Sequence, residues 1–304
     1  MDLFQLEAFV TVVREGSFSK AAKALYRTQP AVSQIIRKLE DEIGQLLFDR
    51  ASRRGVLTDA GQVLLEHAER LMNFRGQALA ALDDVRNLRS GQLVIASNEL
   101  TCLYLLPLLH EYRRLYPAVR ISVRRGLASR IPADVRDYGA DLGVVTYQPD
   151  DAELQSVVVY HDQLAFVVPK SHAFTRRKQV GIKDLGKEPF VAHHVSSPYR
   201  ARVVDTFRRK RVTLQMPVEM PTIDAIKKFV AAGNGVALLP VIAVESELER
   251  GELVRVHVPE LAFERPVRLI FRKGGSVSHA ASAFLSVAEE HATKVRGRFA
   301  FTRE

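Results

Sequence analysis

The spacing of apolar residues predicts three short helices at the start of the chain, because hydrophobic side chains recur there every three or four positions. These helices would span about residues 2–15, 17–25 and 28–44, each bounded by residues typical of helix ends. The second and third are joined by a tight link, which is the pattern of a helix-turn-helix. The positions predicted to be buried are Leu3, Leu6, Phe9, Val10 and Val13, then Ala21, Ala22 and Leu25, then Val32, Ile35, Ile36, Leu39 and Ile43.

The helix after Thr28 has an exposed face made of hydrogen-bonding side chains. Gln29, Ser33 and Arg37 recur every four residues opposite the apolar positions. Glutamine can pair with adenine, arginine with guanine or a phosphate, and serine with either, so this face is typical of a helix that reads a major groove. The acidic residues Glu40–Glu42 lie at the other end, where we expect them to point away from phosphates. A surface helix that is merely polar remains an alternative for this segment taken alone.

Two short apolar runs, Leu46–Phe48 and Val56–Leu57, enclose a basic turn after this helix. The pattern predicts a β-hairpin wing. Arg50, Arg53 and Arg54 at its tip would contact backbone phosphates, which position a protein without reading the base sequence. For any one of these arginines, a solvated basic turn is the alternative.

A long helix is predicted from the Thr58 cap to about Leu88, roughly 45 Å at ~1.5 Å per residue. A helix of this length with one apolar stripe usually packs on a partner helix, often from another subunit, although burial against its own domain is an alternative. The segment Asn87–Leu93 has no apolar period and is the best linker candidate. The stripe comprises Val63, Leu64, Ala68, Leu71, Phe74, Ala78, Leu82, Val85 and Leu88.

From Gln92 onward, strand-like apolar runs alternate with helical patterns, which predicts an α/β domain with mostly parallel sheets. Its length suits two subdomains. The expected strands carry the sequences LVIAS, VRISVRR, ADLGVV, QLAFVVP, PFVAHH, GVALLP, LVRVHVP and VRLIFRK, with helices near YLLPLLHEYRRLY, Tyr199–Arg209, Ile223–Ala232 and Val277–His291.

Length, charge and cysteine content narrow the class of protein. A chain of 304 residues is too long for one ordinary core. The net charge is +9, but residues 1–89 hold 13 Lys and Arg against 12 Asp and Glu, so charge alone does not mark the DNA-binding segment. We expect a cytoplasmic protein without a membrane span or secretory signal. The single cysteine, Cys102, excludes an intrachain disulfide and a cysteine-based zinc cluster, and it fits a reducing compartment.

Over about sixty residues the chain resembles the winged helix-turn-helix of the LysR-type transcriptional regulators. The matching motifs are GSFSKAA, then TQPAVSQ continuing as I-KLE-E-G--LF-R, and LT-AG. The resemblance extends weakly into the second part through LYLLPLLHEYRRLYPAV, GADLGVV, FVVP and AAGNGVALLP. It implies a periplasmic-binding-protein-like effector domain whose two lobes are joined by two crossing strands.

The resemblance implies a prokaryotic repressor or activator that binds double-stranded DNA as a homodimer or homotetramer and responds to a small-molecule effector. RNA polymerase is a further candidate partner. The expected domains are 1–58, a linker and dimerisation helix with hinge at 59–91, and the effector domain at 92–304. Its first lobe would cover about 92–162 and 266–304, and its second about 163–265. Carried onto matching positions, DNA contact is assigned to Thr28, Gln29, Pro30, Ser33 and Arg37, with Arg50 and Arg53 on phosphates; Gln34 departs from the arginine of many members.

Ligands of open α/β sheets bind beyond the carboxyl ends of strands, where helix N-termini point. Hydroxyls and helix N-termini favour a polar or anionic effector, whereas Glu99 would repel a carboxylate if it faced the cleft. Each serine or threonine could instead be an ordinary helix cap. The residues that this rule selects are Asn98, Glu99, Thr101, Ser129, Thr146, His194, Ser196, Ser197 and Thr222.

Enzymatic readings find little support in the sequence, and we expect no catalytic residue, metal or cofactor. His193 and His194 would point to opposite faces of a strand. The segment Gly233-Asn234-Gly235 lacks the third glycine of a dinucleotide loop. Cys102 has no resolving partner in the chain, so a packed thiol is favoured over a redox sensor. The rival class is a solute-binding or enzymatic α/β domain whose N-terminal extension serves only dimerisation.

Overall fold

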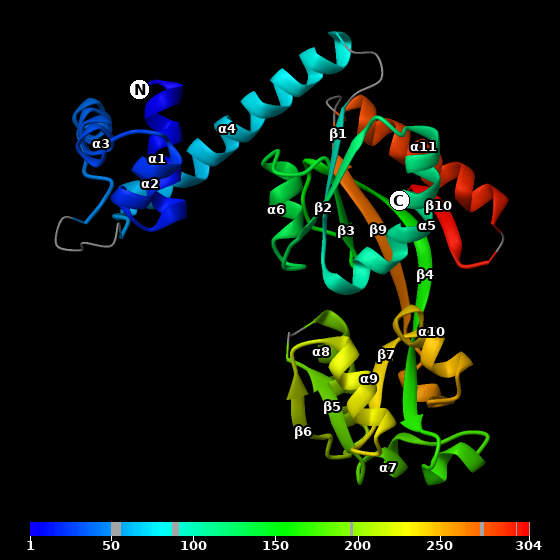
Figure 1. Ribbon diagram of the computed structural model, residues 1–304. Coiled ribbons are helices and arrows are strands. Elements are labelled where there is room, and N and C mark those ends of the chain that lie inside the picture. Colours follow the sequence, from blue (N-terminus) through cyan, green and yellow to red (C-terminus); the bar gives the residue numbers. More distant parts are fainter. Residues whose placement is uncertain (50–55, 87–90, 195–196, 274–276, 296, 304) are drawn as a thin grey trace.

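The computed structural model describes residues 1–49, 56–86, 91–194, 197–273, 277–295 and 297–303. The chain forms a small helical domain, a long helix, and an α/β domain of two lobes placed one above the other in Figure 1. Among the described residues, no helix combines the length and the apolar content that a membrane span requires.

The helical domain confirms the three short helices and most of their buried positions. These are α1 (Leu3–Glu15), α2 (Phe18–Ala24) and α3 (Gln29–Ile43). Phe9, Val32 and Leu39 are fully buried in one shared core. Leu3 and Ile43 were predicted to be buried but are 46% and 37% exposed, because both lie at helix ends beyond the reach of this core.

Glu40 ties the wing to α3. Its side chain is only 8% exposed, and Oε1 accepts hydrogen bonds from the backbone N–H of Leu47 at 2.8 Å and of Phe48 at 3.3 Å. Phe48 in turn forms an isolated antiparallel bridge with Leu57, so the base of the predicted hairpin is present. The acid is therefore a structural group, a role that the sequence pattern did not suggest.

The long helix α4 (Asp59–Arg86) begins where the wing ends. Thr58 caps it by accepting a hydrogen bond from Gly61 N–H at 3.0 Å, as predicted. Gly61 packs directly on the wing, because a Cβ at this position would lie 2.1 Å from the carbonyl oxygen of Leu47. Among the stripe residues whose side chains are described, Leu64 and Ala68 pack in this core, whereas Val63 is 62%, Leu71 46% and Phe74 51% exposed.

The upper lobe in Figure 1, called lobe I, is a sheet between two helical layers. Helices α5 and α11 cover one face of the sheet, and α6 covers the other. The first three strands pair in parallel, with β1 in the middle. Lobe I comprises β1 (Gln92–Ser97), α5 (Glu99–Leu115), β2 (Arg120–Arg125), α6 (Ile131–Arg136), β3 (Leu142–Val145), α11 (His279–Lys294) and β10 (Phe299–Arg303).

The lower lobe, called lobe II, is built around two core clusters. Strands β5 and β6 pair in parallel, and a bridge from Phe190 to Val236 joins them to the strand that follows. Lobe II comprises η1 (Ala173–Arg176), α7 (Ile182–Leu185), β5 (Pro189–His193), α8 (Pro198–Arg209), β6 (Gln215–Met220), α9 (Ile223–Ala231), β7 (Ala237–Pro240), α10 (Val241–Glu249), β8 (Leu253–Val256) and η2 (Pro259–Leu261).

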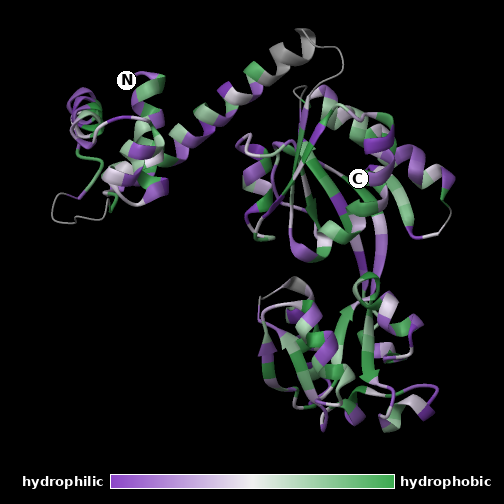
Figure 2. Cartoon of the chain, in the orientation of Figure 1, coloured by the Kyte–Doolittle hydropathy of each residue, from purple (hydrophilic) through white to green (hydrophobic). Residues whose placement is uncertain are grey.

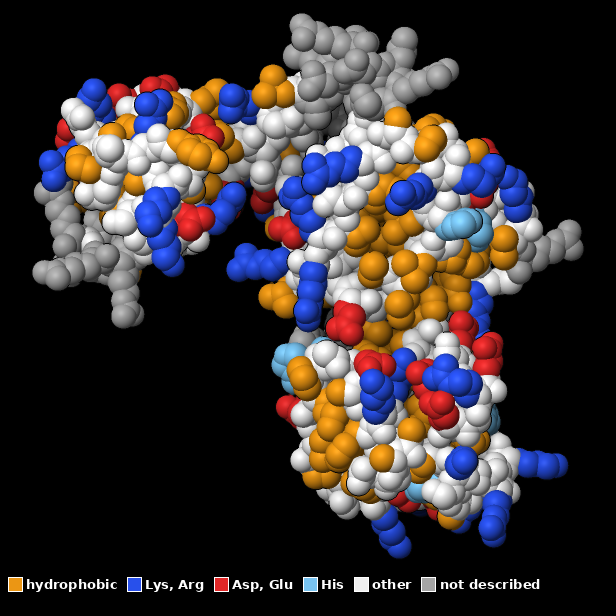
Figure 3. All heavy atoms as spheres, in the orientation of Figure 1, with side chains coloured by type: hydrophobic (Ala, Val, Ile, Leu, Met, Phe, Trp, Pro, Cys, Tyr) orange, Lys and Arg blue, Asp and Glu red, His pale blue; other side chains and the backbone are white. Residues whose placement is uncertain are grey.

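Two strands connect the lobes: β4 (Leu154–Pro169) runs through both, and β9 (Glu264–Arg272) runs from the crossing into lobe I. They pair antiparallel from Leu154–Arg272 to Gln163–Glu264. β4 also pairs antiparallel with β7, β8 and β10, and β9 with β3. The expectation of mostly parallel sheets is therefore wrong for this part, because the crossing strands return through the sheet in the opposite direction. Figure 2 shows that both strands are hydrophilic where they cross between the lobes, and Figure 3 shows charged side chains of both signs where the lobes meet.

We expect Glu40→Ala to lower the free energy of unfolding of the helical domain by about 1–3 kcal/mol, since two buried N–H groups would lose their acceptor. Glu40→Gln keeps a carbonyl oxygen at this position and should retain most of that stability. Urea unfolding of both variants, with amide hydrogen exchange at Leu47, measures the effect. Equal stability of the alanine and glutamine variants would contradict the role assigned to Glu40.

Candidate functional site

One candidate surface is the outer face of α3. Thr28, Gln29, Pro30, Gln34 and Arg37 are exposed, and Ser33 is half-buried. Thr28 stands at the N-cap position, but its side chain makes no cap hydrogen bond and is left available. Gln29 Nε2 donates to Ser33 Oγ at 2.8 Å, which restrains the amide on the helix surface. The predicted contact residues thus share one exposed face. Arg50, Arg53 and Arg54 lie outside the described residues.

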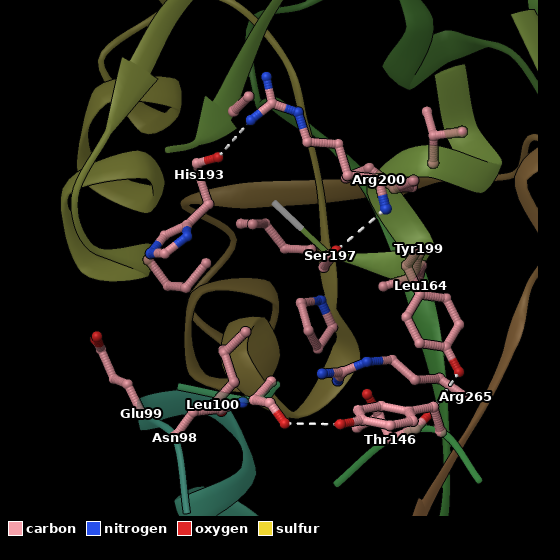
Figure 4. Close-up of a pocket in the computed structure, with 18 of the residues that line it drawn as sticks. Asn98, Glu99, Leu100, Thr146, Leu164, His193, Ser197, Tyr199, Arg200 and Arg265 are labelled. Atoms are coloured by element: carbon pink, nitrogen blue, oxygen red, sulfur yellow. Dashed lines mark hydrogen bonds between the residues drawn. The ribbon is translucent and has the colours of Figure 1, made fainter. Parts of the chain in front are cut away.

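The other candidate site is a cavity of about 260 Å³ between lobe I and lobe II (Figure 4). Lobe I contributes the loop after β1, the loop after β2 and the end of β3, as the strand-end rule predicts. Lobe II contributes β5, α8 and the strands beside them, while the crossing strands form the floor.

Four of the nine predicted effector residues line this cavity, namely Asn98, Glu99, Thr146 and Ser197. Four others do not line it: Thr101, Ser129, His194 and Thr222. Ser196 lies outside the described residues.

Helix capping explains why some of the predicted residues do not line the cavity. Thr101 is fully buried and closes a capping box with Asn98, donating its N–H to Asn98 Oδ1 at 2.8 Å. Thr222 caps α9 by accepting from Ala225 N–H at 3.2 Å. Ser197 caps α8 in the same way and still lies at the cavity wall.

Arg265 lines the cavity floor but was not predicted from the sequence. It lies at the start of β9, whereas the strand-end rule selects residues after an apolar strand. Arg265 faces Asp162 across the two crossing strands, and its Nη1 donates to Asp162 Oδ2 at 3.1 Å and to the Tyr104 hydroxyl at 2.8 Å. Tyr104 also donates to Asp162. The Asp162 side chain is fully buried, and its Oδ1 has no hydrogen-bond partner within the described part of the chain. Burial raises the pKa of the Tyr104 hydroxyl, which therefore stays a donor.

Tyr199, also missed, joins the two lobes. It lies in the first turn of α8, and its hydroxyl donates to the backbone oxygen of Thr146 in lobe I at 3.1 Å. The Arg265 guanidinium lies 5.6 Å from the centre of the Tyr199 ring, within cation–π range. Burial raises the pKa of Tyr199. Figure 4 shows the Arg265 side chain reaching from beside Tyr199 into the middle of the cavity.

Two further basic residues line the cavity. Arg200 donates to the backbone oxygen of His193 at 3.0 Å and pairs with Glu219, so it is held in place. Arg125 lies at the end of β2 and is exposed at the rim. The lining thus holds three guanidinium groups and the carboxylate of Glu99, while Glu219 and Asp162 pair with Arg200 and Arg265 from outside the lining.

Clusters of metal-ligating side chains and the cysteine thiol are the other groups in the described residues that could carry chemistry. Among the residues the structure describes, no three His, Cys, Asp or Glu side chains gather closely enough to hold a metal ion. Cys102 is half-buried, and burial raises the pKa of its thiol, which lowers the fraction of reactive thiolate.

Comparisons with known proteins match both parts of the chain. Residues 3–62 match the model of the bacterial regulatory helix-turn-helix proteins of the lysR family, and residues 86–293 match the LysR substrate binding domain. A probable RuBisCO transcriptional regulator from Gracilaria tenuistipitata var. liui is 32% identical over 290 residues, covering 93% of this chain and 94% of that protein.

Solved structures share the fold. CbnR, a LysR family transcriptional regulator solved with its target DNA, has a TM-score of 0.72 at 19% identity, covering 95% of this chain and 99% of CbnR. The regulatory domain of CcmR from Synechocystis PCC6803, in complex with 2-PG, has a TM-score of 0.60 at 23% identity. That match covers 66% of this chain and 96% of the domain.

We expect Arg265→Gln to lower the free energy of unfolding by about 3–5 kcal/mol, because it leaves the buried Asp162 carboxylate without its cation. The double variant Asp162→Asn/Arg265→Gln should recover part of this loss. Urea unfolding of the full chain followed by circular dichroism measures both. Arg255→Gln, an exposed arginine on β8, is the matched control and should change stability by no more than about 0.5 kcal/mol. An Arg265→Gln variant as stable as Arg255→Gln would refute the stabilising role assigned to the buried ion pair.

Proposed function

The chain belongs to the LysR-type family of DNA-binding transcriptional regulators, and from this premise we propose that α3 reads a base sequence while the inter-lobe cavity binds a small polar or anionic effector. The observation that carries the proposal is the pairing of a hydrogen-bonding face on α3 with a cavity rich in arginine in the same chain.

The proposal for α3 rests on side chains that do not pack into the core of the helical domain. Gln29 can pair with adenine N6 and N7, and Arg37 with guanine or a phosphate. Thr28, Pro30, Ser33 and Gln34 complete the proposed contact face. The arginines of the wing are proposed to bind phosphates and to set the orientation on the duplex. The solved complex of CbnR with its target DNA supports this arrangement at the level of the fold.

The proposal for the cavity rests on charge and helix ends. The first turns of α5 and α8 both reach the wall, at Glu99 and Tyr199, and N–H groups of a first helical turn favour anions. Arg265 adds a cation at the floor. Because Tyr199 already bonds lobe I, a ligand held by both lobes would favour the closed arrangement over an open one. The presence of 2-PG in the CcmR regulatory domain supports effector binding by this fold.

We further propose that α4 mediates dimerisation. Val63, Leu71 and Phe74 lie on one side of the helix and are 62%, 46% and 51% exposed in the single chain. Their spacing of eight and three residues places them on one helical face. A second copy would cover this face and would supply the second α3 that a two-fold symmetric DNA site requires. Effector binding would then act by changing how the subunits pack, and with it the spacing of the DNA-binding domains.

We expect Arg37→Ala to weaken binding to a DNA fragment that the protein selects from a random pool by roughly 5- to 150-fold, if the guanidinium contacts a base. Arg208→Ala is the control, since it removes the same charge from an 80% exposed side chain on α8, in lobe II. Fluorescence anisotropy at several salt concentrations measures both. Unchanged affinity in a folded Arg37→Ala variant would remove this residue from the contact face.

We expect Leu71→Asp to convert the protein to monomers at micromolar concentration, because the charge would be buried against the partner helix. Gln62→Asp introduces the same residue at an exposed position on another side of α4 and should leave the assembly intact. Sedimentation velocity of the full chain distinguishes the two. A dimer that survives Leu71→Asp would show that another surface holds the subunits together.

A further inference from the structure

The inter-lobe cavity has two halves, one contributed by each lobe. Lobe I contributes the polar side chains of Asn98, Thr146 and Arg125 together with the apolar Leu100 and Leu127. Lobe II contributes His193, Ser197 and Arg200 at one part of its wall and an apolar recess at another. We call this apolar part the lobe II recess. It is formed by Phe190 on β5, Val203 on α8, Leu214 and Met216 at β6, and Leu238 on β7.

The charge that a ligand would meet lies at the border between these halves. Arg265 lies at the floor there, and one edge of its guanidinium is engaged by Asp162 and Tyr104. Its positive charge is thus partly balanced by a carboxylate before any ligand arrives. Arg200 is likewise balanced by Glu219, and Glu99 adds a negative charge to the wall. This balance suits one negative charge better than two.

The recess sets a second condition on the ligand. Hydroxyl groups of a sugar phosphate would face Phe190, Leu214, Met216 and Leu238 without hydrogen-bond partners, and burying an unsatisfied hydroxyl is unfavourable. An apolar body in the same place gains free energy from the apolar surface that it removes from water. The volume of about 260 Å³ lies at the small end for ligand cavities, so the body is small.

We propose that the effector is an amphipathic monocarboxylate, whose aromatic or branched aliphatic body fills the lobe II recess while its carboxylate pairs with Arg265 at the border. The carboxylate accepts from the free edge of the guanidinium and from the polar wall of lobe I. This proposal rests on the proposed function, because it names the chemical class of the ligand in the same cavity. It separates this chain from the CcmR regulatory domain, which was solved in complex with 2-PG.

Calorimetric titration of the full-length protein tests the proposal with named probes. The apolar monocarboxylates are 4-methylbenzoate and 4-methylpentanoate; 4-methylbenzamide removes the charge and keeps the body; 2-PG and inorganic phosphate are the polar anions. We expect both monocarboxylates to bind, and the amide and polar anions to bind at least about tenfold more weakly. Met216→Gln should raise the Kd of the monocarboxylates about tenfold or more, since it places an amide in the recess.

Met220→Gln is the matched control, because it makes the same substitution on β6 at a half-buried position that does not line the cavity. Tighter binding of 2-PG or phosphate, equal effects of the two glutamine variants, or no binding of either monocarboxylate overturns the proposal. Titrating the same samples with the DNA fragment selected from the random pool distinguishes failure of this proposal from failure of the proposed function. DNA binding without binding of either acid would refute only the proposed class of ligand. Loss of DNA binding as well would refute the proposed function.

Discussion

The ion pair between Asp162 and Arg265 lies where the two strands that join the lobes cross, and the geometry of the cavity depends on it. Both side chains are buried, with the Asp162 carboxylate held also by Tyr104 of α5. Charges taken out of water are stable only with well-placed partners, so this cluster strongly favours one register of β4 on β9. The same guanidinium forms part of the cavity floor. The strand crossing and the proposed effector site therefore share the Arg265 side chain.

Strand β9 connects this floor to the long helix. Arg272 lies seven positions after Arg265, which is about 23 Å along a strand at ~3.3 Å per residue. Arg272 is buried and donates to the backbone oxygens of Val135 and Ala140 at 2.5 and 2.9 Å, and to Gln77 Oε1 of α4 at 3.3 Å. Asn73 of α4 donates to the oxygen of Asp137 nearby at 3.2 Å. A displacement of β9 at the cavity would thus be transmitted to α4 through the hydrogen bond between Arg272 and Gln77, without an intervening loop.

The sequence predicted the elements whose periodicity is regular and missed the parts where polar residues interrupt it. The helical domain and the strand-end loops carry clear apolar patterns, so α3, Asn98 and Thr146 were placed correctly relative to their elements. β4 was recognised only from Gln163 onward, as QLAFVVP, because the polar pair His161-Asp162 interrupts its apolar pattern. In the structure these polar residues continue the strand and form the crossing. Thr101 and Ser197 could not be separated by sequence, since capping a helix and lining a cavity use the same hydroxyl chemistry.

The nearly balanced charge of residues 1–89 also has a structural explanation. Several acids there are engaged within the helical domain: Asp2 caps α1, Glu40 holds the wing, and Glu42 bonds Gln5 and the N-terminal amine. Hydrogen bonds from that amine, and next from Gln5, keep the pKa of Glu42 below its usual value, so the carboxylate stays ionised. Arg37 on the outer face of α3 remains exposed. Because these acidic side chains are engaged within the helical domain, the net charge of residues 1–89 underestimates the positive potential of the exposed α3 face. The pairing of individual charges is therefore a better guide than net charge to where DNA would bind.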